Sequence, residues 1–366
     1  MLRHMGQHGG GLLVHTQSLL PKLFSVGSDN EFVLIYQDPR FVGSYADVGN
    51  VKEVVVKVPE KFAWDQVAVP WVARKERLDV LFNPKYSLPL AVRCKTVFVC
   101  HGMDWYVMPQ WSRWIDRMSH RYLIPRYAHK ADKVIAVSNT ARDHFIKYLK
   151  VPPDRVETVY HGVNESFYEP VPSARLDQIR STYGLPERFF LYCGQIYPPK
   201  NFGRLLRAYA RVGPELGIHL VVAGEHRWLC GEELDLIDEL QLTDWVVRPG
   251  WIGHEELPAF YRLAAALVLP SLYEACPSPP LEAMASDCPV LTANRHGTKE
   301  IAGEAALLVD PEDVEAISDG MRRLATDEGL RRELVEAGRR RVRSFDWETC
   351  ARETLRVLES VADGGT

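Results

Sequence analysis

Short apolar runs alternate along the whole chain with stretches of helical spacing, and this alternation constrains the fold more than any other feature. The runs in the first half are residues 32–36, 54–58, 80–82, 96–100, 134–137 and 156–160. Runs of the same kind recur in the second half at 189–193, 219–223, 245–248, 264–269 and 289–292. Strands this short and apolar, separated by helices, are typical of parallel sheets covered on both faces. We predict an α/β protein.

The length of the chain is sufficient for two domains, because 366 residues exceed what one core of ordinary size needs. Pro170, Pro172 and Ser173 mark a linker near the middle. We therefore predict a first domain at 1–165 and a second at 166–345. Residues 346–366 follow as a final helix.

Charge and cysteine usage exclude some classes of protein. The 44 basic and 48 acidic residues nearly balance at a net charge of −4, so we expect no nucleic acid partner. The seven cysteines are scattered singly, which suggests reduced thiols and a cytoplasmic protein. No apolar run approaches a membrane span and no secretory signal opens the chain, although the protein could still sit on a membrane surface.

Two glutamates flank a proline-rich turn that follows the predicted strand at 264–269. Glu274 lies on the loop beyond the strand, and Glu282 lies in the helix that follows. Ser278 is placed to cap this helix, with Pro279 at its first position. Open α/β sheets bind ligands in this crevice. The alternative is that both carboxylates are simply solvated.

The start of that helix is a candidate anion site. We expect the backbone N–H groups of Leu281 and Glu282 to lack intrahelical partners and to face an anion such as a diphosphate. Ser278, Pro280 and Leu281 are therefore candidate substrate-binding residues.

This stretch carries a family resemblance. The pattern S-x-Y-E-x7-E-A-M-A, followed by Pro289-Val290, Asn294 and E-I-A-G-E-A-A-L-L-V-D-P, resembles the signature of the family 4 retaining glycosyltransferases (glycosyl transferases group 1). The resemblance implies the GT-B fold, in which two Rossmann-like domains face each other across a cleft. It also implies a first domain that binds the acceptor, a second that binds the nucleotide sugar, and a last helix that crosses back to the first domain.

The activity that this resemblance implies is the transfer of a hexose from a nucleotide diphosphate sugar, GDP-mannose or a UDP-hexose, to a glycan or lipid-linked acceptor. Glu282 would hold the ribose hydroxyls and Glu274 the sugar hydroxyls near the anomeric carbon. The sequence departs from the family at 275–277, where many members have Gly-Phe-Gly, because Pro277 has no N–H to donate.

A lysine follows the first predicted strand of the second domain. Gly194 turns the chain after 189–193, and Lys200 stands at a predicted helix amino terminus, where its ammonium could neutralise a departing diphosphate. Many family members carry an arginine where this chain has Gln195, and Arg204 could substitute for it. We find no D-x-D pair or other evident metal site and expect no metal or other cofactor. The alternative for Lys200 is a surface lysine.

Two other residues follow predicted strands. His101 comes after 96–100, and a histidine here lines the sugar site in the family. The alternative interpretation is that His101 is a buried histidine whose ring is satisfied by a backbone carbonyl. Trp251 lies in a turn that passes beside the nucleobase in the family, and a core tryptophan is an equal alternative.

A glycine loop, 9–11, opens the chain's first predicted helix. Gly10 and Gly11 are candidate substrate contacts, because glycine lets backbone and ligand approach closely. The strand that precedes this loop in the family is missing here. Either Met1 is not the natural start, which we favour, or the first sheet lacks its first strand; a flexible linker is the alternative for the loop.

The segment 111–133 has an amphipathic basic pattern. Its aromatic and apolar side chains fall on one side, and arginines recur every four residues on the other (Trp111, Trp114, Ile115, Met118 and Tyr122; Arg113, Arg117 and Arg121). One interpretation is peripheral docking to anionic lipid. We favour the other, in which the aromatic side packs into the domain core.

Two rival functions stay open. One is an epimerase or phosphorylase of the same fold, which an assay with and without acceptor would separate. The other is a non-catalytic scaffold subunit, against which Glu274, Glu282, Lys200 and His101 argue.

Overall fold

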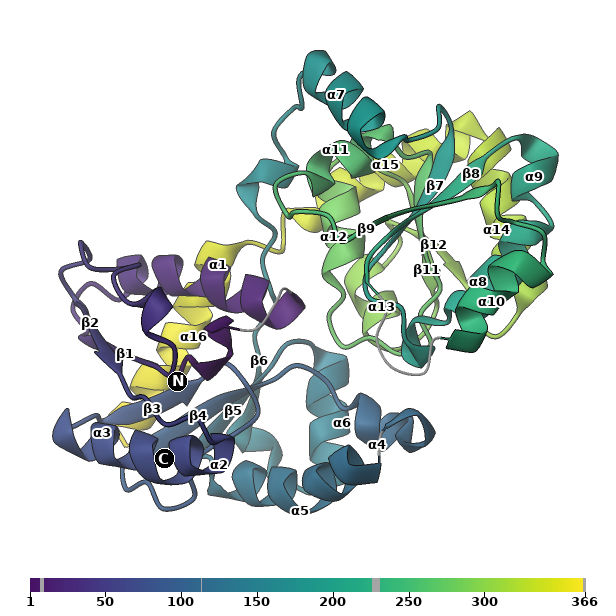
Figure 1. Cartoon of the computed structure of the whole chain (residues 1–366). Coiled ribbons are helices and arrows are strands. Elements are labelled where there is room, and N and C mark those ends of the chain that lie inside the picture. The colour runs from purple at the N-terminus through teal and green to yellow at the C-terminus, as the bar shows by residue number, and fades with distance from the viewer. Residues whose placement is uncertain (7–9, 113, 226–230, 365–366) are drawn as a thin grey trace. The chain divides into compact units, whose positions relative to one another are not determined.

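The computed structural model describes residues 1–6, 10–112, 114–225 and 231–364. The chain forms two compact units (Figure 1). The N-terminal domain comprises Met1–Gly162 together with Asp346–Thr366, and the C-terminal domain comprises Val163–Phe345. The chain thus leaves the N-terminal domain after Gly162 and returns at Asp346.

The N-terminal domain contains parallel strands in two groups. β1 (Phe32–Tyr36) pairs with β2 (Val51–Val55), and β3 (Val80–Asn83), β4 (Lys95–Cys100), β5 (Lys133–Ala136) and β6 (Val156–Thr158) form a sheet in that order. Met1 and Leu2 lie between the groups: the Met1 amino group donates to the Phe82 carbonyl (2.9 Å) and the Leu2 amide to the Ile35 carbonyl (2.8 Å).

The helices of this domain are α1 (Gly11–Val26), α2 (Lys61–Ala63), a π-helical turn η3 (Trp64–Ala68), α3 (Val69–Lys75), α4 (Asp104–Val107), α5 (Trp114–Lys130), α6 (Asn139–Leu149) and α16 (Trp347–Ala362). α16 packs against α1 and against β3, β4 and β5. Ser138 caps α6 by accepting from the Ala141 amide at 3.0 Å.

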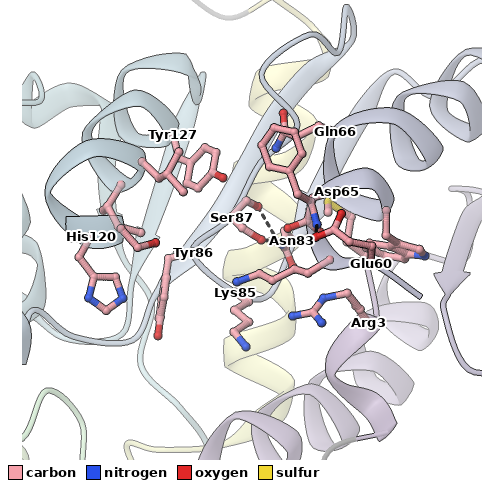
Figure 2. A pocket seen from close by; sticks show the side chains of 17 residues that line it. Arg3, Glu60, Asp65, Gln66, Asn83, Lys85, Tyr86, Ser87, His120 and Tyr127 are labelled. Carbon is pink, nitrogen blue, oxygen red and sulfur yellow. Dashed lines mark hydrogen bonds between the residues drawn. The ribbon is translucent and has the colours of Figure 1, made fainter. Parts of the chain in front are cut away.

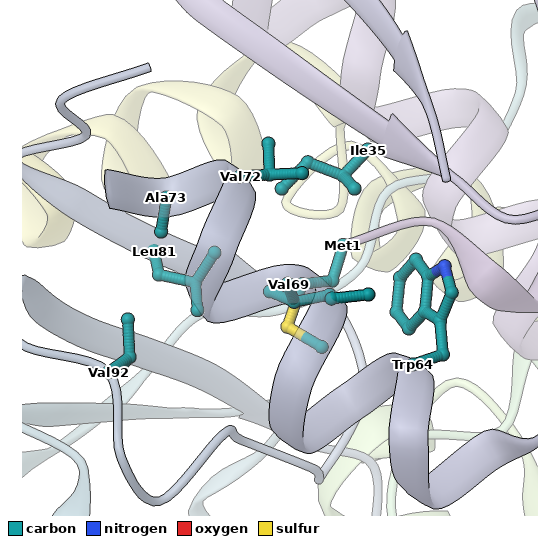
Figure 3. Packing of buried hydrophobic residues seen from close by; sticks show 9 residues of the cluster. Met1, Ile35, Trp64, Val69, Val72, Ala73, Leu81 and Val92 are labelled. Carbon is teal, nitrogen blue, oxygen red and sulfur yellow. The ribbon is translucent and has the colours of Figure 1, made fainter. Parts of the chain in front are cut away.

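One buried cluster joins the two strand groups (Figure 3). It brings together Ile35 from β1, Leu81 from β3, and Trp64 and Val69 from the helical segment between them. The Trp64 indole N–H donates to the Val56 carbonyl at 3.1 Å. This core therefore holds η3 and α3 against β1 and β3.

The C-terminal domain has a six-stranded parallel sheet of order β12-β11-β10-β7-β8-β9. The strands are β7 (Phe189–Cys193), β8 (His219–Ala223), β9 (Val246–Gly250), β10 (Ala266–Leu269), β11 (Val290–Ala293) and β12 (Leu307–Val309). The order reverses between β7 and β10, because the chain builds outward from β7 on one side and then from β10 on the other. Ligands bind beyond the carboxyl ends of strands at such a switch point.

The helices of this domain are α7 (Ser173–Tyr183), α8 (Phe202–Ala210), α9 (Gly213–Leu216), α10 (Gly231–Glu239), α11 (Leu257–Leu263), α12 (Ser278–Ala285), α13 (His296–Ala302), α14 (Val314–Thr326) and α15 (Glu328–Val342). α8 packs with α10 and α14, and α12 packs with α11, α13 and α15. The predicted α/β class with parallel sheets is confirmed.

Candidate functional site

Lys200 and Glu274 meet at the switch point of the C-terminal sheet. Lys200 ends a short 3-10 turn after β7, and Glu274 lies on the loop after β10. The Lys200 Nζ donates to Glu274 Oε1 at 2.5 Å, and the Ser271 hydroxyl donates to the same oxygen at 2.9 Å. The two charged side chains are only 11% and 12% exposed, so the surface-lysine alternative is wrong.

Asn201 fixes the loops around this ion pair, and sequence reasoning did not assign it a role. Its backbone is left-handed (φ 62°), a conformation that asparagine tolerates better than most residues. Its side-chain amide donates to the carbonyls of Pro270 (2.9 Å) and Pro311 (2.6 Å), and its Oδ1 accepts from Arg204 (3.0 Å). Arg204 therefore contacts the residue that follows Lys200 in the chain.

Glu282 is a buried carboxylate on α12, with 7% of the residue exposed. The Tyr261 hydroxyl donates to Oε2 at 2.8 Å, and His254 Nε2 lies 3.5 Å from Oε1. The Cys193 thiol at the end of β7 has its pKa raised to about 12, by burial first and then by the charge of Glu282. The solvated-charge alternative is therefore wrong for Glu282. Sequence reasoning missed Tyr261, whose only signal was its place in an apolar helical segment.

The start of α12 differs from the prediction. The helix begins at Ser278 with Pro277 as its N-cap, and no side chain caps it, so the predicted Ser278 cap is wrong. A helix leaves its first four N–H groups unpaired, which here belong to positions 277–280. Three of these are prolines and lack the N–H, so Ser278 alone offers one. Leu281 and Glu282 lie past the unpaired positions, and Pro280 and Leu281 are buried.

Glycines close the ends of neighbouring strands at this site. Gly194 (φ 135°) donates its N–H to Ala223, and a Cβ on Gly224 would lie 2.0 Å from the Gly194 carbonyl oxygen. Only glycine permits this approach of two backbones. Beyond β9, Trp251 is 59% exposed, so the core-tryptophan alternative is wrong and its ring is open to a planar ligand.

In the N-terminal domain, His101 follows β4 as predicted. Its Nε2 lies 2.7 Å from the Pro84 carbonyl oxygen, which can only accept, so Nε2 carries the proton. Burial lowers the pKa of His101 to about 4, and the ring is therefore neutral at pH 7. The alternative interpretation predicted a contact between the buried His101 ring and a backbone carbonyl, and this contact is present. It leaves Nδ1 as a hydrogen-bond acceptor.

The glycine loop lies partly outside the described residues, which exclude Gly9. Gly10 is the N-cap of α1 and Gly11 its first residue, and both are exposed. A Cβ at either position would meet no atom within 4 Å. The backbone of Gly10 and Gly11 is therefore open on this side.

α5 does not pack its aromatic side into the core. Trp114, Met118 and Tyr122 are 68%, 46% and 51% exposed, so the core interpretation that we favoured is wrong for them. Arg117 and Arg121 are exposed as well. Arg113 and the Ile115 side chain lie outside the described residues. Of the helices described, none combines the length and apolar character needed to cross a bilayer.

Comparisons with known proteins agree with this geometry. The profile of Glycosyl transferases group 1 matches residues 177–341, and that of Glycosyltransferase Family 4 matches 9–167. O-antigen chain mannosyltransferase B of Escherichia coli is 26% identical over 79% of this chain and 76% of its own length. Serotype-specific mannosyltransferase WbdA of Escherichia coli is 30% identical over 73% of this chain, which spans only 34% of that relative.

Solved structures resemble the whole chain. The Anabaena Alr3699/HepE structure in complex with UDP and glucose has a TM-score of 0.76 at 17% identity, covering 97% of both chains. WaaG, a glycosyltransferase involved in lipopolysaccharide biosynthesis, has a TM-score of 0.72 at 18% identity, covering 95% of this chain and 96% of its own. Together with the two profiles, which span both domains, these likenesses show that the chain is a family 4 glycosyltransferase with the GT-B fold of two Rossmann-like domains.

Proposed function

We propose that the protein is a retaining, metal-independent hexosyltransferase that uses GDP-mannose or a UDP-hexose and transfers the sugar to a hydroxyl of a glycan or glycolipid. The observation that carries the proposal is the Lys200–Glu274 ion pair beside buried Glu282 at the switch point of the C-terminal sheet. Mannosyltransferase relatives favour mannose, whereas the structural neighbour with UDP and glucose favours a UDP-hexose.

Glu282 would hold the nucleotide. The Tyr261 hydroxyl donates to Oε2 of Glu282, whereas His254 Nε2 lies 3.5 Å from Oε1. A carboxylate has about four acceptor positions, so the remaining lone pairs can accept from two ribose hydroxyls. Trp251 would lie against the base.

Lys200 would stabilise the leaving diphosphate. Its ammonium has three donors, of which Glu274 takes one, so two are available to phosphate oxygens. Arg204 would add a second positive charge, and Ser278 the one free amide of the α12 terminus. These groups are held in place before the reaction, so charge growing on the diphosphate meets donors that need no reorganisation.

Glu274 would orient the sugar. Lys200 and Ser271 both contact Oε1, which leaves Oε2 for a sugar hydroxyl near the anomeric carbon. In the N-terminal domain, neutral His101 and the open Gly10 and Gly11 backbone would contact the hexose and the phosphates.

A thermal-shift panel of UDP, GDP and ADP sugars, with magnesium and with EDTA, tests the donor part. A nucleotide that binds only the folded state raises the melting midpoint by mass action. We expect one nucleotide to stand out, its shift to survive EDTA, and Glu282→Ala to abolish it. Glu336→Ala, an exposed glutamate on α15 of the same domain, is the matched control. No shift by any sugar nucleotide at millimolar concentration would overturn the proposal.

The exposed residues of α5 support a peripheral contact with lipid. Tryptophan and tyrosine at a bilayer interface combined with arginines near anionic headgroups is the pattern of monotopic helices. We include this contact in the proposal, since a lipid-linked acceptor would be presented at such a surface.

A further inference from the structure

The N-terminal domain contains a cavity of about 260 Å³ at the carboxyl end of β3 (Figure 2). The last residue of β3 and the segment after it (Asn83, Lys85 and Tyr86) form one wall, the α2–η3 segment a second, and α5 a third. None of the site residues that the sequence predicted lines it. Its volume suits one or two sugar rings better than a nucleotide sugar, because pockets for larger ligands run from about 300 to 1,000 Å³.

Asp65 on η3 is the exceptional side chain of this cavity. The residue is 4% exposed, yet its carboxylate makes no hydrogen bond or ion pair with any residue that the structure describes. Its polar neighbours are satisfied: Glu60 accepts from two backbone amides, and Gln66 donates to the Leu88 carbonyl and accepts from the Leu90 amide. Buried polar groups without partners are rare, because desolvation without a new hydrogen bond destabilises the fold.

Cations lie near Asp65 without pairing with it. Burial raises the pKa of Asp65, and this effect exceeds the opposing one of Arg3, Lys61, Lys85 and the Met1 amino group, which act on the Asp65 charge from a distance. The side chains of Arg3 and Lys85 extend into the same part of the cavity in Figure 2. A gap therefore separates a buried hydrogen-bond acceptor from a guanidinium donor.

An aromatic group forms another part of the wall. Tyr86 and His120 line the cavity, and their rings pack with Trp105 at centroid distances of 4.9 and 4.3 Å. His120 Nδ1 and Trp105 Nε1 are buried, and neither has a hydrogen-bond partner among the described residues. Burial lowers the pKa of His120, so the ring is neutral and can accept as well as donate.

We propose that this cavity binds a neutral sugar unit of the acceptor glycan, with Asp65 accepting from ring hydroxyls and Arg3 donating to one of them. The inference rests on the proposed function, which supplies a glycan acceptor. Each hydroxyl both donates and accepts, so neighbouring hydroxyls of one ring satisfy the carboxylate and the guanidinium together. A phosphate would satisfy Arg3 but would be repelled by Asp65.

Asp65 is then a specificity-determining residue. A site built to hydrogen-bond a hydroxyl discriminates strongly against ligands that lack it, because the buried polar group is left unpaired. Tyr86 and His120 would contribute an apolar face for the C–H side of the ring.

The test is calorimetric titration of the full-length protein, without nucleotide sugar, with α-mannotriose and maltotriose as neutral probes and mannose 6-phosphate as the anionic probe. We expect Asp65→Asn to weaken binding of a neutral probe by about ten- to a hundredfold, because hydrogen bonds to charged groups are the stronger ones. The same variant should bind mannose 6-phosphate at least as well as the wild type. Asp116→Asn, an exposed carboxylate on α5, is the matched control and should change neither.

Two results would overturn the inference: neutral binding that is unchanged in Asp65→Asn, or binding of the phosphorylated probe alone that Asp65→Asn strengthens. Asp65→Asn should melt no lower than the wild type, so loss of fold would not explain loss of binding. The nucleotide thermal shift reports the donor site separately. If that shift fails while neutral glycans bind through Asp65, the cavity stands as a glycan site and the transferase proposal falls.

Discussion

The buried carboxylates of the two candidate sites, one in each domain, are organised in opposite ways. At the switch point of the C-terminal domain the carboxylates have donors: Glu274 accepts from Lys200 and Ser271, and Glu282 accepts from Tyr261, while Asn201 donates to two carbonyls. His254 Nε2, 3.5 Å from Glu282, has no hydrogen-bond partner among the described residues. In the cavity of the N-terminal domain, buried Asp65 and His120 Nδ1 stay unpaired among the described residues.

This difference has a chemical consequence. A site whose side chains hold one another is preorganised, which suits the part of a transferase that must stabilise developing charge. A site with unpaired groups is completed by its ligand, which suits selection among acceptors. Substitutions should therefore destabilise the protein in the first region and leave it equally or more stable in the second.

The largest effect is expected for Lys200→Met. Removing a preorganised cation from the leaving diphosphate should lower kcat by about 10²- to 10³-fold. It should also lower the free energy of unfolding by about 3 kcal/mol, because Glu274 would be a buried charge without its partner. Steady-state kinetics and chemical denaturation measure the two quantities.

Adding Glu274→Gln to Lys200→Met separates the two effects. The double variant should regain much of the stability, because no unpaired charge remains, but none of the activity. Stability that stays low in the double variant would show that the ion pair is not the source of the loss.

The next effect is expected for Asn201→Asp. Aspartate tolerates the left-handed backbone, but its carboxylate cannot donate to the carbonyls of Pro270 and Pro311. We expect a loss of about 2 kcal/mol in unfolding free energy, from two buried carbonyls left without donors. Gln241→Glu is the control in the same domain, because Gln241 also has a left-handed backbone (φ 55°) but is exposed, and it should stay within about 0.5 kcal/mol of the wild type.

The sequence predicts the bounds of some strands more accurately than those of others. The strands at Phe32–Tyr36, Phe189–Cys193 and His219–Ala223 are predicted to the residue, because each is an apolar run with polar residues or glycine beyond it. β2 is Val51–Val55 and not 54–58, because Lys52 and Glu53 interrupt the apolar run in the sequence but pair with β1 in the sheet.

The same contrast holds for the sites. Lys200 and Glu274 lie on the loops that follow β7 and β10, and Glu282 lies in the helix after the second loop, so their position at one edge of the sheet follows from topology. Tyr261 and Asp65 lie in helical segments away from any strand end. Tyr261 pairs with Glu282 and Asp65 stays unpaired because of tertiary packing, which no local sequence pattern predicts.

Lipid binding extends the comparison to the surface of the N-terminal domain. Arg117→Gln with Arg121→Gln should weaken binding to anionic vesicles by about 30-fold, since each arginine near such a surface contributes about 1 kcal/mol. Sedimentation with phosphatidylglycerol vesicles measures this, and neutral phosphatidylcholine vesicles should show little binding. The matched pair Arg332→Gln with Arg340→Gln, exposed on α15 of the C-terminal domain, should have no effect. Equal losses in both pairs would refute a dedicated surface on α5.

The smallest effect is the pH dependence that Asp65 adds to stability. Burial raises the pKa of Asp65 in the folded state above its ordinary value of 3.8, so the folded protein holds this proton more tightly than the unfolded chain does. The wild type should therefore lose stability relative to Asp65→Asn as the pH rises above that value, and the difference should become constant once the folded carboxyl is ionised.

Calorimetric melting of both proteins between pH 4 and pH 7 measures this difference, with Asp116→Asn as the flat control. A carboxylate that is paired in solution, for example with Arg3, would give the opposite sign: its pKa would be lowered, and Asp65→Asn would be the less stable protein at pH 7. A less stable Asp65→Asn variant would show that Asp65 has a partner, and the two sites would then not differ in this respect. A bound neutral trisaccharide should instead reduce the difference, because its hydroxyls hydrogen-bond the ionised form and supply the partners that the fold leaves out.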